Sequence, residues 1–285
     1  MNRLDIVTFL SDFGWSGGYV AACEATVARI QPHARVFHIS HEVDLGDVAA
    51  GAMTLERVAP LFPVAVHLAV IDPGVGTGRW PLALTTARGD ALVGPDNGLL
   101  LAAADALGGL SAAWLLDPER VRAQAGLPVG WVSSTFHGRD VFAPAAALLS
   151  ALVDPRTIGS SLDSSALVRL TLPKAEVTGE GAIADVVEVD RFGNVGLALR
   201  FADFSPGQGA FTVEIVGEDP PEWNARVVQT YGELRPGELG IFCDSWGQVA
   251  LALNGASAAQ LLSVDRGRTV RLAIVPGSSS TERLA

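Results

Sequence analysis

A glycine-rich loop at residues 72–79 follows the strongest strand signal in the 285-residue chain. Its three glycines would let the backbone approach a ligand closely. The loop does not end in Gly-Lys-Ser/Thr, so it is not a Walker A loop, and it lacks the glycine spacing of a dinucleotide fingerprint. An ordinary long loop with a surface salt bridge between Asp72 and Arg79 is the alternative. The spacing alone leaves both interpretations open.

His137 stands in a second loop, just before a predicted helix and beside Arg139 and Asp140. A histidine titrates near neutral pH, so this loop offers a base, a cation and an acid within four residues. Arg139 and Asp140 could instead form a plain ion pair at the start of the helix. The loop alone favours neither interpretation.

Asp12 and Asn97 lie where apolar runs give way to polar residues. At the end of the first strand, the Asp12 carboxylate could accept hydrogen bonds from a ribose diol, or it could form an Asx turn or a helix N-cap. Asn97 belongs to a Pro-Asp-Asn-Gly turn whose polar side chains could line a crevice. Local turn formation is the simpler interpretation of both segments.

The C-terminal half carries two further polar turns. One runs from Asp190 to Asn194 and has the residues of a hairpin turn, and the other contains Ser245. Metal binding is weakly supported, because His38 and His41 have no third ligand at a characteristic spacing. The chain also lacks the Gly-x-Ser-x-Gly motif of serine hydrolases.

The elements that must position these loops alternate between strand and helix signals over the first 150 residues. Strands are expected at 4–10, 36–39, 64–71, 82–86 and 91–93, and helices at 18–30, 48–62, 99–107 and 141–152. The strands at 82–86 and 91–93 are expected to form a hairpin. This alternation predicts an α/β domain with a mostly parallel sheet flanked by helices, with binding residues at the carboxyl ends of the strands.

After about residue 161 the pattern changes to short strand-like runs separated by Gly, Pro, Asp and Asn, which is typical of a small β-rich domain. The runs lie at 170–172, 182–189, 195–199, 211–216, 240–243, 249–253 and 270–275. We therefore predict an α/β N-terminal domain at residues 1–165 and a smaller β-rich C-terminal domain at 174–285.

The composition is that of a globular protein, with 49% hydrophobic and 18% charged residues and a formal charge of −11. This negative charge argues against nucleic acid as a partner. Cys23 and Cys243 fit no disulfide or metal pattern and are expected to be small buried apolar residues. No signal peptide is recognised at the start, and the apolar stretch at 58–71 is too short and interrupted to span a bilayer. A cytoplasmic protein without membrane contact is expected.

The motifs are more specific in combination than singly. The chain has SDFG at 11–14, VIDPGVGTGR at 70–79, GPDNGLL at 94–100, FHGRD at 136–140 and DRFGN at 190–194. This order resembles the S-adenosyl-L-methionine (SAM) hydrolases, also called SAM hydroxide adenosyltransferases, a family related to the SAM-dependent fluorinases and chlorinases. The resemblance runs from about residue 7 to about residue 275. It implies a barrel-like C-terminal domain and a homotrimer with each site between one subunit's N-terminal domain and a neighbour's C-terminal domain.

The resemblance implies that Asp72, Arg79 and His137 form the catalytic Asp–Arg–His set of the hydrolases. SAM would be the substrate, no cofactor would be needed, and water or hydroxide would attack ribose C5′ to give adenosine and L-methionine. Arg79 would favour hydroxide character, and either Asp72 or His137 could be the base. The halogenases have an aromatic hydroxyl at the aspartate position, and a carboxylate there would repel a halide, so Asp72 disfavours halogenation.

The same resemblance implies the binding residues. Asp12 corresponds to the acceptor of the ribose diol, and Asn194 to a reader of adenine with Phe192 packed beside it. Asp190 and Ser245 correspond to groups that hold the amine and the carboxylate of methionine, which need an anion and hydrogen-bond donors.

The chain departs from the family pattern at four places. The family often has an acid between the SDFG motif and the following tyrosine, where this chain has Gly17-Gly18 before Tyr19. His38-Ile-Ser-His41 stands where the family usually reads Asp-x-Thr-His, Trp246 stands where fluorinases place an arginine, and Gly196 where they place an aromatic residue. Two alternatives therefore stay open beside the hydrolase: a chlorinase-like SAM-dependent halogenase, and a non-catalytic sensor that binds adenosine or SAM.

Overall fold

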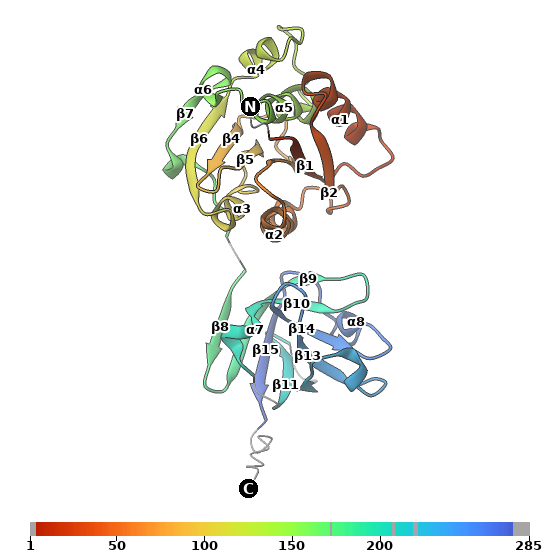
Figure 1. Ribbon diagram of the computed structural model, residues 1–285. Coiled ribbons are helices and arrows are strands. Elements are labelled where there is room, and N and C mark those ends of the chain that lie inside the picture. The colour runs from red at the N-terminus through yellow and green to blue at the C-terminus, as the bar shows by residue number, and fades with distance from the viewer. Residues whose placement is uncertain (1–3, 172, 207–208, 219–221, 276–285) are drawn as a thin grey trace. The chain divides into compact units, whose positions relative to one another are not determined.

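The computed structural model describes residues 4–171, 173–206, 209–218 and 222–275. The chain divides into two compact units, Met1–Leu170 and Thr171–Ala285, and both are drawn in Figure 1. The first unit has α/β architecture and the second is built mainly from β-strands. Each unit is described by itself.

A mixed sheet forms the centre of the first unit. Its strands are β1 (Ile6–Ser11), β2 (Arg35–Ser40), β3 (Val66–Val70), β4 (Pro81–Thr86), β5 (Ala91–Pro95), β6 (Leu110–Leu116) and β7 (Gly159–Leu162). They lie in the order β2-β1-β3-β5-β4-β6-β7. The first four are parallel neighbours, and the remaining pairs are antiparallel. The predicted mostly parallel sheet is confirmed, as is the antiparallel pairing of β4 and β5.

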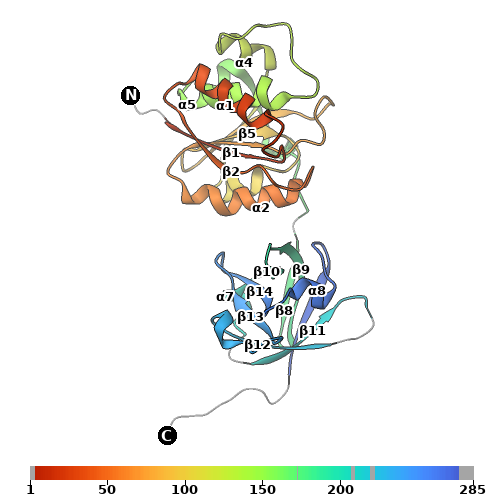
Figure 2. The same cartoon turned by 90° about the vertical axis from the view of Figure 1, so that its right-hand side faces the viewer.

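Helices cover both faces of this sheet. They are α1 (Tyr19–Ile30), α2 (Val48–Val58), α3 (Leu101–Ala106), α4 (Pro118–Gln124), α5 (Ala143–Ser150) and α6 (Pro155–Ile158), with 3₁₀ turns η1 (Ala59–Leu61) and η3 (Ser164–Ala166) and a π turn η2 (Gly138–Phe142). Figure 2 shows α1 and α5 on one face of the sheet and α2 on the other. Because side chains alternate along a strand, Val7 and Phe9 of β1 pack in the α1/α5 core, whereas Leu10 packs with α2 and α3.

The second unit contains a closed barrel. Its elements are β8 (Ala175–Thr178), β9 (Gly181–Val189), β10 (Val195–Arg200), α7 (Phe201–Phe204), β11 (Ala210–Ile215), β12 (Trp223–Val227), η4 (Tyr231–Glu233), β13 (Leu239–Cys243), β14 (Gln248–Leu253), α8 (Ala258–Leu262) and β15 (Thr269–Ile274). The strand order is β10-β14-β13-β12-β11-β15-β9, and pairing of β9 with β10 closes the ring. β8 adds to β9 outside the ring. The predicted barrel-like domain is confirmed, and alternate residues of its strands fill the interior.

Several elements differ from the predictions. Strands β6, β7, β8 and β12 were not expected, since their small or polar residues lack strong strand patterning. Leu170 and Thr171 of the expected run at 170–172 are not in a strand, and residue 172 lies outside the described residues. The predicted helix at 141–152 is shorter and is entered through the π turn η2.

The two cysteines also differ from each other. Cys23 is buried, as expected, and burial raises the pKa of its thiol to about 12. Cys243 is exposed, so the expectation of burial is wrong for it: it ends β13, where its side chain faces outward. Among the described residues, no helix has the length and apolar character required to cross a membrane.

Candidate active site

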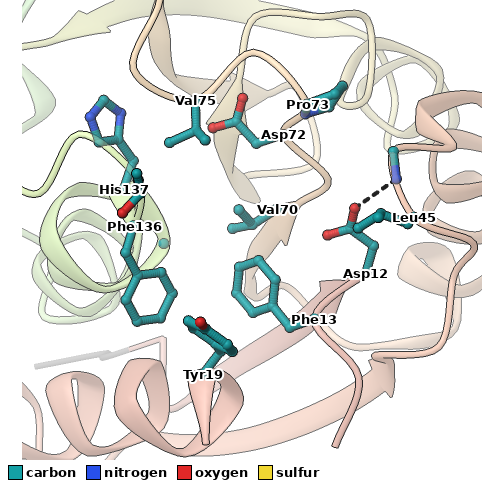
Figure 3. A pocket seen from close by; sticks show the side chains of 13 residues that line it. Asp12, Phe13, Tyr19, Leu45, Val70, Asp72, Pro73, Val75, Phe136 and His137 are labelled. Atoms are coloured by element: carbon teal, nitrogen blue, oxygen red, sulfur yellow. Dashed lines mark hydrogen bonds between the residues drawn. The ribbon is translucent and has the colours of Figure 1, made fainter. Parts of the chain in front are cut away.

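Two carboxylates follow neighbouring parallel strands and meet at one edge of the first sheet. Ser11 of β1 pairs with Val70 of β3. Asp12 directly follows the end of β1, and Asp72 follows the end of β3 by two residues. Carboxyl ends of parallel strands share one edge, so the two side chains line the same cavity of about 610 Å³. Figure 3 shows them on its wall, with His137 across from Asp12.

Aromatic side chains form the apolar wall of this cavity. Phe13, Tyr19 and Phe136 line it, and Figure 3 shows the three rings gathered together below the carboxylates. Their centroids lie 5.0–6.1 Å apart in edge or tilted contacts, with 5.0 Å between Tyr19 and Phe136. An apolar wall beside a few polar groups is the usual construction of a small-molecule site.

Asp72 and Arg79 form a buried ion pair. The Arg79 Nε atom donates to Asp72 Oδ1 at 2.8 Å, and Nη2 donates to Oδ2. Only 10% of the arginine side chain and 6% of the aspartate side chain are exposed, so the alternative of a surface salt bridge is wrong. The guanidinium also lies 5.1 Å from the centre of the Phe142 ring. Arg79 is therefore a fixed cation in a shielded setting, where charge interactions are stronger than in water.

Arg79 also fixes the protonation of His137. Its Nη2 atom lies 2.8 Å from His137 Nδ1. A guanidinium can only donate, so Nδ1 accepts, and the neutral ring carries its proton on Nε2. Burial, followed by the charge of Arg79, lowers the pKa of His137, although the charges of Asp72 and Asp140 oppose this effect. His137 is thus a neutral imidazole at neutral pH, with an Nε2–H group to donate.

Arg139 and Asp140 form a separate ion pair. Arg139 donates to both oxygens of Asp140, at 2.8 and 2.9 Å, and Asp140 also accepts from the Ser133 amide. These bonds, with Arg122 nearby, hold the pKa of Asp140 below its usual range against the effect of burial. The ion-pair interpretation holds for these two residues, which brace the segment before η2.

Asp12 is positioned by the loop that precedes α2. Its Oδ2 atom accepts from the Gly46 amide at 2.8 Å, and Figure 3 shows the other oxygen directed toward the cavity. Gly46 has a φ of +74°, a conformation that favours glycine. Leu45, the residue before Gly46, is 91% exposed and lines the same cavity.

Asn97 lies behind the site. Its Nδ2 atom donates to the Ile71 carbonyl at 2.8 Å, and its Oδ1 accepts from the Leu99 amide. The side chain thus ties the turn after β5 to the residue that precedes Asp72. The geometry gives Asn97 a supporting position and no place among the residues that line the cavity.

In the second unit, three predicted residues line one cavity of about 380 Å³: Asp190, Asn194 and Ser245. Both oxygens of Asp190 are engaged inside their own turn, by the Asn194 side chain at 2.7 Å and by the amides of Phe192 and Asn194 at 2.9 Å. The predicted turn is therefore present. Phe192 is 81% exposed and lines a separate recess.

The same cavity also contains two positions at which the sequence departs from the family pattern. Gly196 and Trp246 both line it, together with Tyr231, whose hydroxyl oxygen accepts from Asn194 Nδ2 at 3.4 Å. Burial, followed by the charges of Asp190 and Asp244, raises the pKa of Tyr231. The cavity is thus lined by hydrogen-bonding groups and by three aromatic side chains, those of Tyr231, Phe242 and Trp246.

Sequence reasoning missed some lining residues. Leu45 and Val75 carry no local signal, because a single aliphatic residue in a loop has no pattern. Phe13 and Phe136 belong to the SDFG and FHGRD motifs, but the motifs do not predict that the two rings form one wall with Tyr19. Within the described ranges, no group of three His, Cys, Asp or Glu side chains is placed to hold a metal ion.

Comparisons with known proteins give consistent matches over most of the chain. The model of the SAM hydroxide adenosyltransferase N-terminal domain matches residues 7–159, and that of the C-terminal domain matches residues 184–271. An (R)-S-adenosyl-L-methionine hydrolase of Salinispora tropica is 45% identical over 267 residues, which cover 93% of this chain and 97% of the relative. A fluorinase of Actinopolyspora mzabensis is more distant, at 26% identity over 94% of this chain and 96% of the relative.

A solved structure from Thermotoga maritima, described as an uncharacterized conserved protein, superposes with a TM-score of 0.84 at 32% identity. The match covers 94% of this chain and 99% of the Thermotoga chain. Both family models fall within the two compact units, one in each. The chain belongs to the SAM hydroxide adenosyltransferase family.

Proposed function

We propose that this protein is an enzyme that hydrolyses SAM to adenosine and L-methionine. The observation that carries the proposal is the Asp72–Arg79–His137 set, in which a carboxylate and a neutral imidazole line one cavity and the fixed cation Arg79 binds both of them. The similarity to a relative named as an (R)-SAM hydrolase supports the same reaction and suggests the R sulfonium epimer as substrate.

The charges of the cavity suit a cationic substrate. Asp12 and Asp72 bring two negative charges to its wall, and Arg79 offsets one of them. A sulfonium carries a positive charge, which a nearby carboxylate attracts, whereas a halide would be repelled. This electrostatic preference favours the hydrolase over a halogenase.

The reaction balances without a cofactor. The oxygen of water forms a bond to ribose C5′ while the C5′–S bond breaks, and the electron pair of that bond goes to sulfur. Methionine leaves as a neutral thioether, so no acid is needed for the leaving group. One proton is released from the attacking water and passes to a base and then to solvent.

We assign the proton acceptor to Asp72. The only ring lone pair of neutral His137, on Nδ1, is engaged by Arg79, and the lowered pKa of this imidazole makes it a weaker base than an ordinary histidine. Asp72 also accepts from Arg79, but its Oδ1 atom receives one of these hydrogen bonds and keeps a second lone pair for the water. A carboxylate is sufficient, because the attacking water becomes strongly acidic as its bond to carbon forms. His137 would then orient the water through its Nε2–H group.

We further propose that the other binding groups divide between the two units. Asp12 would accept from the ribose diol with its cavity-facing oxygen, and Asn194 and Ser245 would bind adenine and the methionine end in the barrel cavity. In a homotrimer, the cavity of the first unit of one subunit would be completed by the barrel of a neighbour. We also propose that the enzyme acts in the cytoplasm.

A product assay tests the proposal. The pure protein is incubated with each sulfonium epimer in ¹⁸O-labelled water, first without halide and then with added chloride. We expect adenosine labelled at its 5′ oxygen and L-methionine over many turnovers without halide, with loss of about 10²-fold or more in Asp72→Asn. A chloro-nucleoside formed only with chloride would assign the protein to the halogenases. Tight binding without either product would leave the sensor.

A further inference from the structure

A chain of polar side chains runs from the surface of the first unit to the turn that carries Asp12. Ser11 Oγ lies 2.7 Å from His41 Nδ1, and His41 Nε2 lies 2.7 Å from His38 Nδ1. His38 Nε2 faces the Glu24 carboxylate of α1 at 3.8 Å. His41 is fully buried, whereas a quarter of the His38 side chain is exposed. Solvent therefore reaches this chain at its His38 end.

The two ends of the chain give its hydrogen bonds a direction. The Glu24 carboxylate lies beyond hydrogen-bond distance of His38 Nε2, but its negative charge favours the tautomer with the proton on Nε2, in which Nδ1 accepts from His41. His41 Nδ1 then accepts from the Ser11 hydroxyl. At the other end, Ser11 Oγ accepts from the Phe13 amide at 3.3 Å, which can only donate. Every link is satisfied when both imidazoles are neutral.

This chain is joined to the turn at several points. Besides the Ser11–His41 bond, the His41 carbonyl accepts from the Gly14 amide at 2.7 Å. The rings of Phe9 and Trp15 pack edge-on against the His41 imidazole, at 4.6 and 4.7 Å between centroids. The buried imidazole therefore fixes the course of residues 11–15, on which the cavity-lining side chains Asp12 and Phe13 stand.

We propose that His38 and His41 are positioning residues for substrate binding, acting through Ser11 on the turn that carries Asp12 and Phe13. The inference rests on the proposed function and adds to it a role for residues that do not line the cavity. It concerns the binding of substrate, because the turn carries binding groups and the reacting set stands on other loops.

Proton uptake disturbs this arrangement. A proton placed on His38 Nδ1 would meet the proton on His41 Nε2, so the His41 proton would have to move to Nδ1 and the Ser11 hydroxyl would have to turn away. The groups that face the pair are Ser11 and Phe9 from β1, Trp15 from the turn and Glu24 from α1. Burial and the neighbouring His38 lower the pKa of His41 to about 4, which is consistent with a neutral buried ring. A proton added to either ring would therefore disturb the turn.

The test measures kcat and KM for SAM from about pH 7.5 to about pH 5.5, where a histidine titrates, in matched variants. His38→Asn keeps an acceptor for the His41 proton and cannot titrate. His38→Leu removes the acceptor, and Ser11→Ala cuts the chain at its inner end. His33→Asn, at an exposed histidine outside the chain, is the control.

In the wild type and in His33→Asn, we expect KM to rise several-fold toward the acid end while kcat does not follow it. His38→Asn should keep the neutral-pH KM within about twofold and lose the rise, whereas His38→Leu and Ser11→Ala should raise KM about tenfold throughout, as expected when a buried donor or acceptor loses its partner. Wild-type KM values in the Leu and Ala variants, or a lowered melting temperature with unchanged KM, would overturn the proposal.

The affinity for adenosine, measured by calorimetry over the same pH range, separates this inference from the proposed function. If wild-type protein does not turn over SAM, the proposed function fails, and the adenosine affinities of the same variants still decide the positioning role. We expect the pattern of the affinities to follow that of KM. Affinities that are equal in all variants and constant with pH would contradict the inference.

Discussion

Arg79 binds two partners at once, and its contact with His137 sets the tautomer of that ring. The carboxylate of Asp72 receives two of its hydrogen bonds, and the Nδ1 atom of His137 receives a third. The sequence placed these three residues in one set only through the order of the motifs, since Asp72 and Arg79 alone were equally consistent with a surface pair. Burial and tautomer depend on neighbours distant in sequence, such as Phe142, and spacing does not reveal them.

The lowered pKa of His137 predicts a flat pH dependence of kcat near neutrality. The neutral ring is the form that fits Arg79, so activity should be complete above the ordinary histidine pKa of about 6.5 and should fall only in more acid solution. His137→Asn keeps an acceptor near the Nδ1 position and does not titrate, so its kcat should be lower by about 10-fold or more but should lack the acid decline.

Initial rates at saturating SAM over the pH range measure this effect, and the exposed-surface variant His33→Asn serves as the control. A decline in wild-type kcat that begins above neutral pH would contradict the assignment of His137 as a neutral donor, because a histidine acting as base with a raised pKa would give that profile.

At the scale of elements, parallel pairing of β1 with β3 brings Asp12 and Asp72 together. The alternation of strand and helix predicted that polar residues lie at the carboxyl ends of strands, and this is where both carboxylates are found. The strand order was not predictable, because strands β6 and β7 have weak patterns and pair only through contacts remote in sequence. The supporting position of Asn97 was not predictable either, because its hydrogen-bond partner, the Ile71 carbonyl, is remote in sequence.

A glycine in β5 permits the close approach of β5 to β3. A Cβ atom at Gly94 would lie 2.2 Å from the Ala69 carbonyl oxygen, which belongs to the strand that leads to Asp72. Gly94→Ala should therefore lower the free energy of unfolding by about 2 kcal/mol or more, as overpacking does. Gly78→Ala is the control, since a Cβ there would meet no atom within 4 Å. Urea unfolding of both variants measures the difference, and equal midpoints would refute the argument.

At the scale of the whole molecule, two cavities, one in each unit, each hold only part of the predicted site. Asp12, Asp72 and His137 line the first, whereas Asp190, Asn194 and Ser245 line the second. The change to short strand-like runs after about residue 161 predicted two domains of different architecture. Closure of the barrel between β9 and β10, however, depends on the summed twist of all its strands. A local pattern does not contain that information.

The proposed sharing of the site between subunits predicts complementation. Asp72→Asn damages only the first cavity, and Ser245→Tyr should block only the second, so each variant alone should be inactive. When equal amounts are co-expressed, about a quarter of the sites in a ring of heterologous contacts should combine two intact halves. Activity of the mixture reports this, and separately purified proteins assayed together without subunit exchange are the control. No recovery in verified mixed oligomers would show that one subunit supplies both halves.

The two carboxylates at the edge of the first sheet also bear on product release. The substrate would enter this cavity with a sulfonium charge that Asp12 and Asp72 attract, but the reaction converts it into uncharged adenosine and a thioether without that charge. The attraction that favours capture therefore disappears in the chemical step, and the products leave without having to overcome it. Added salt, which screens charge, should weaken capture of SAM while leaving inhibition by adenosine nearly unchanged.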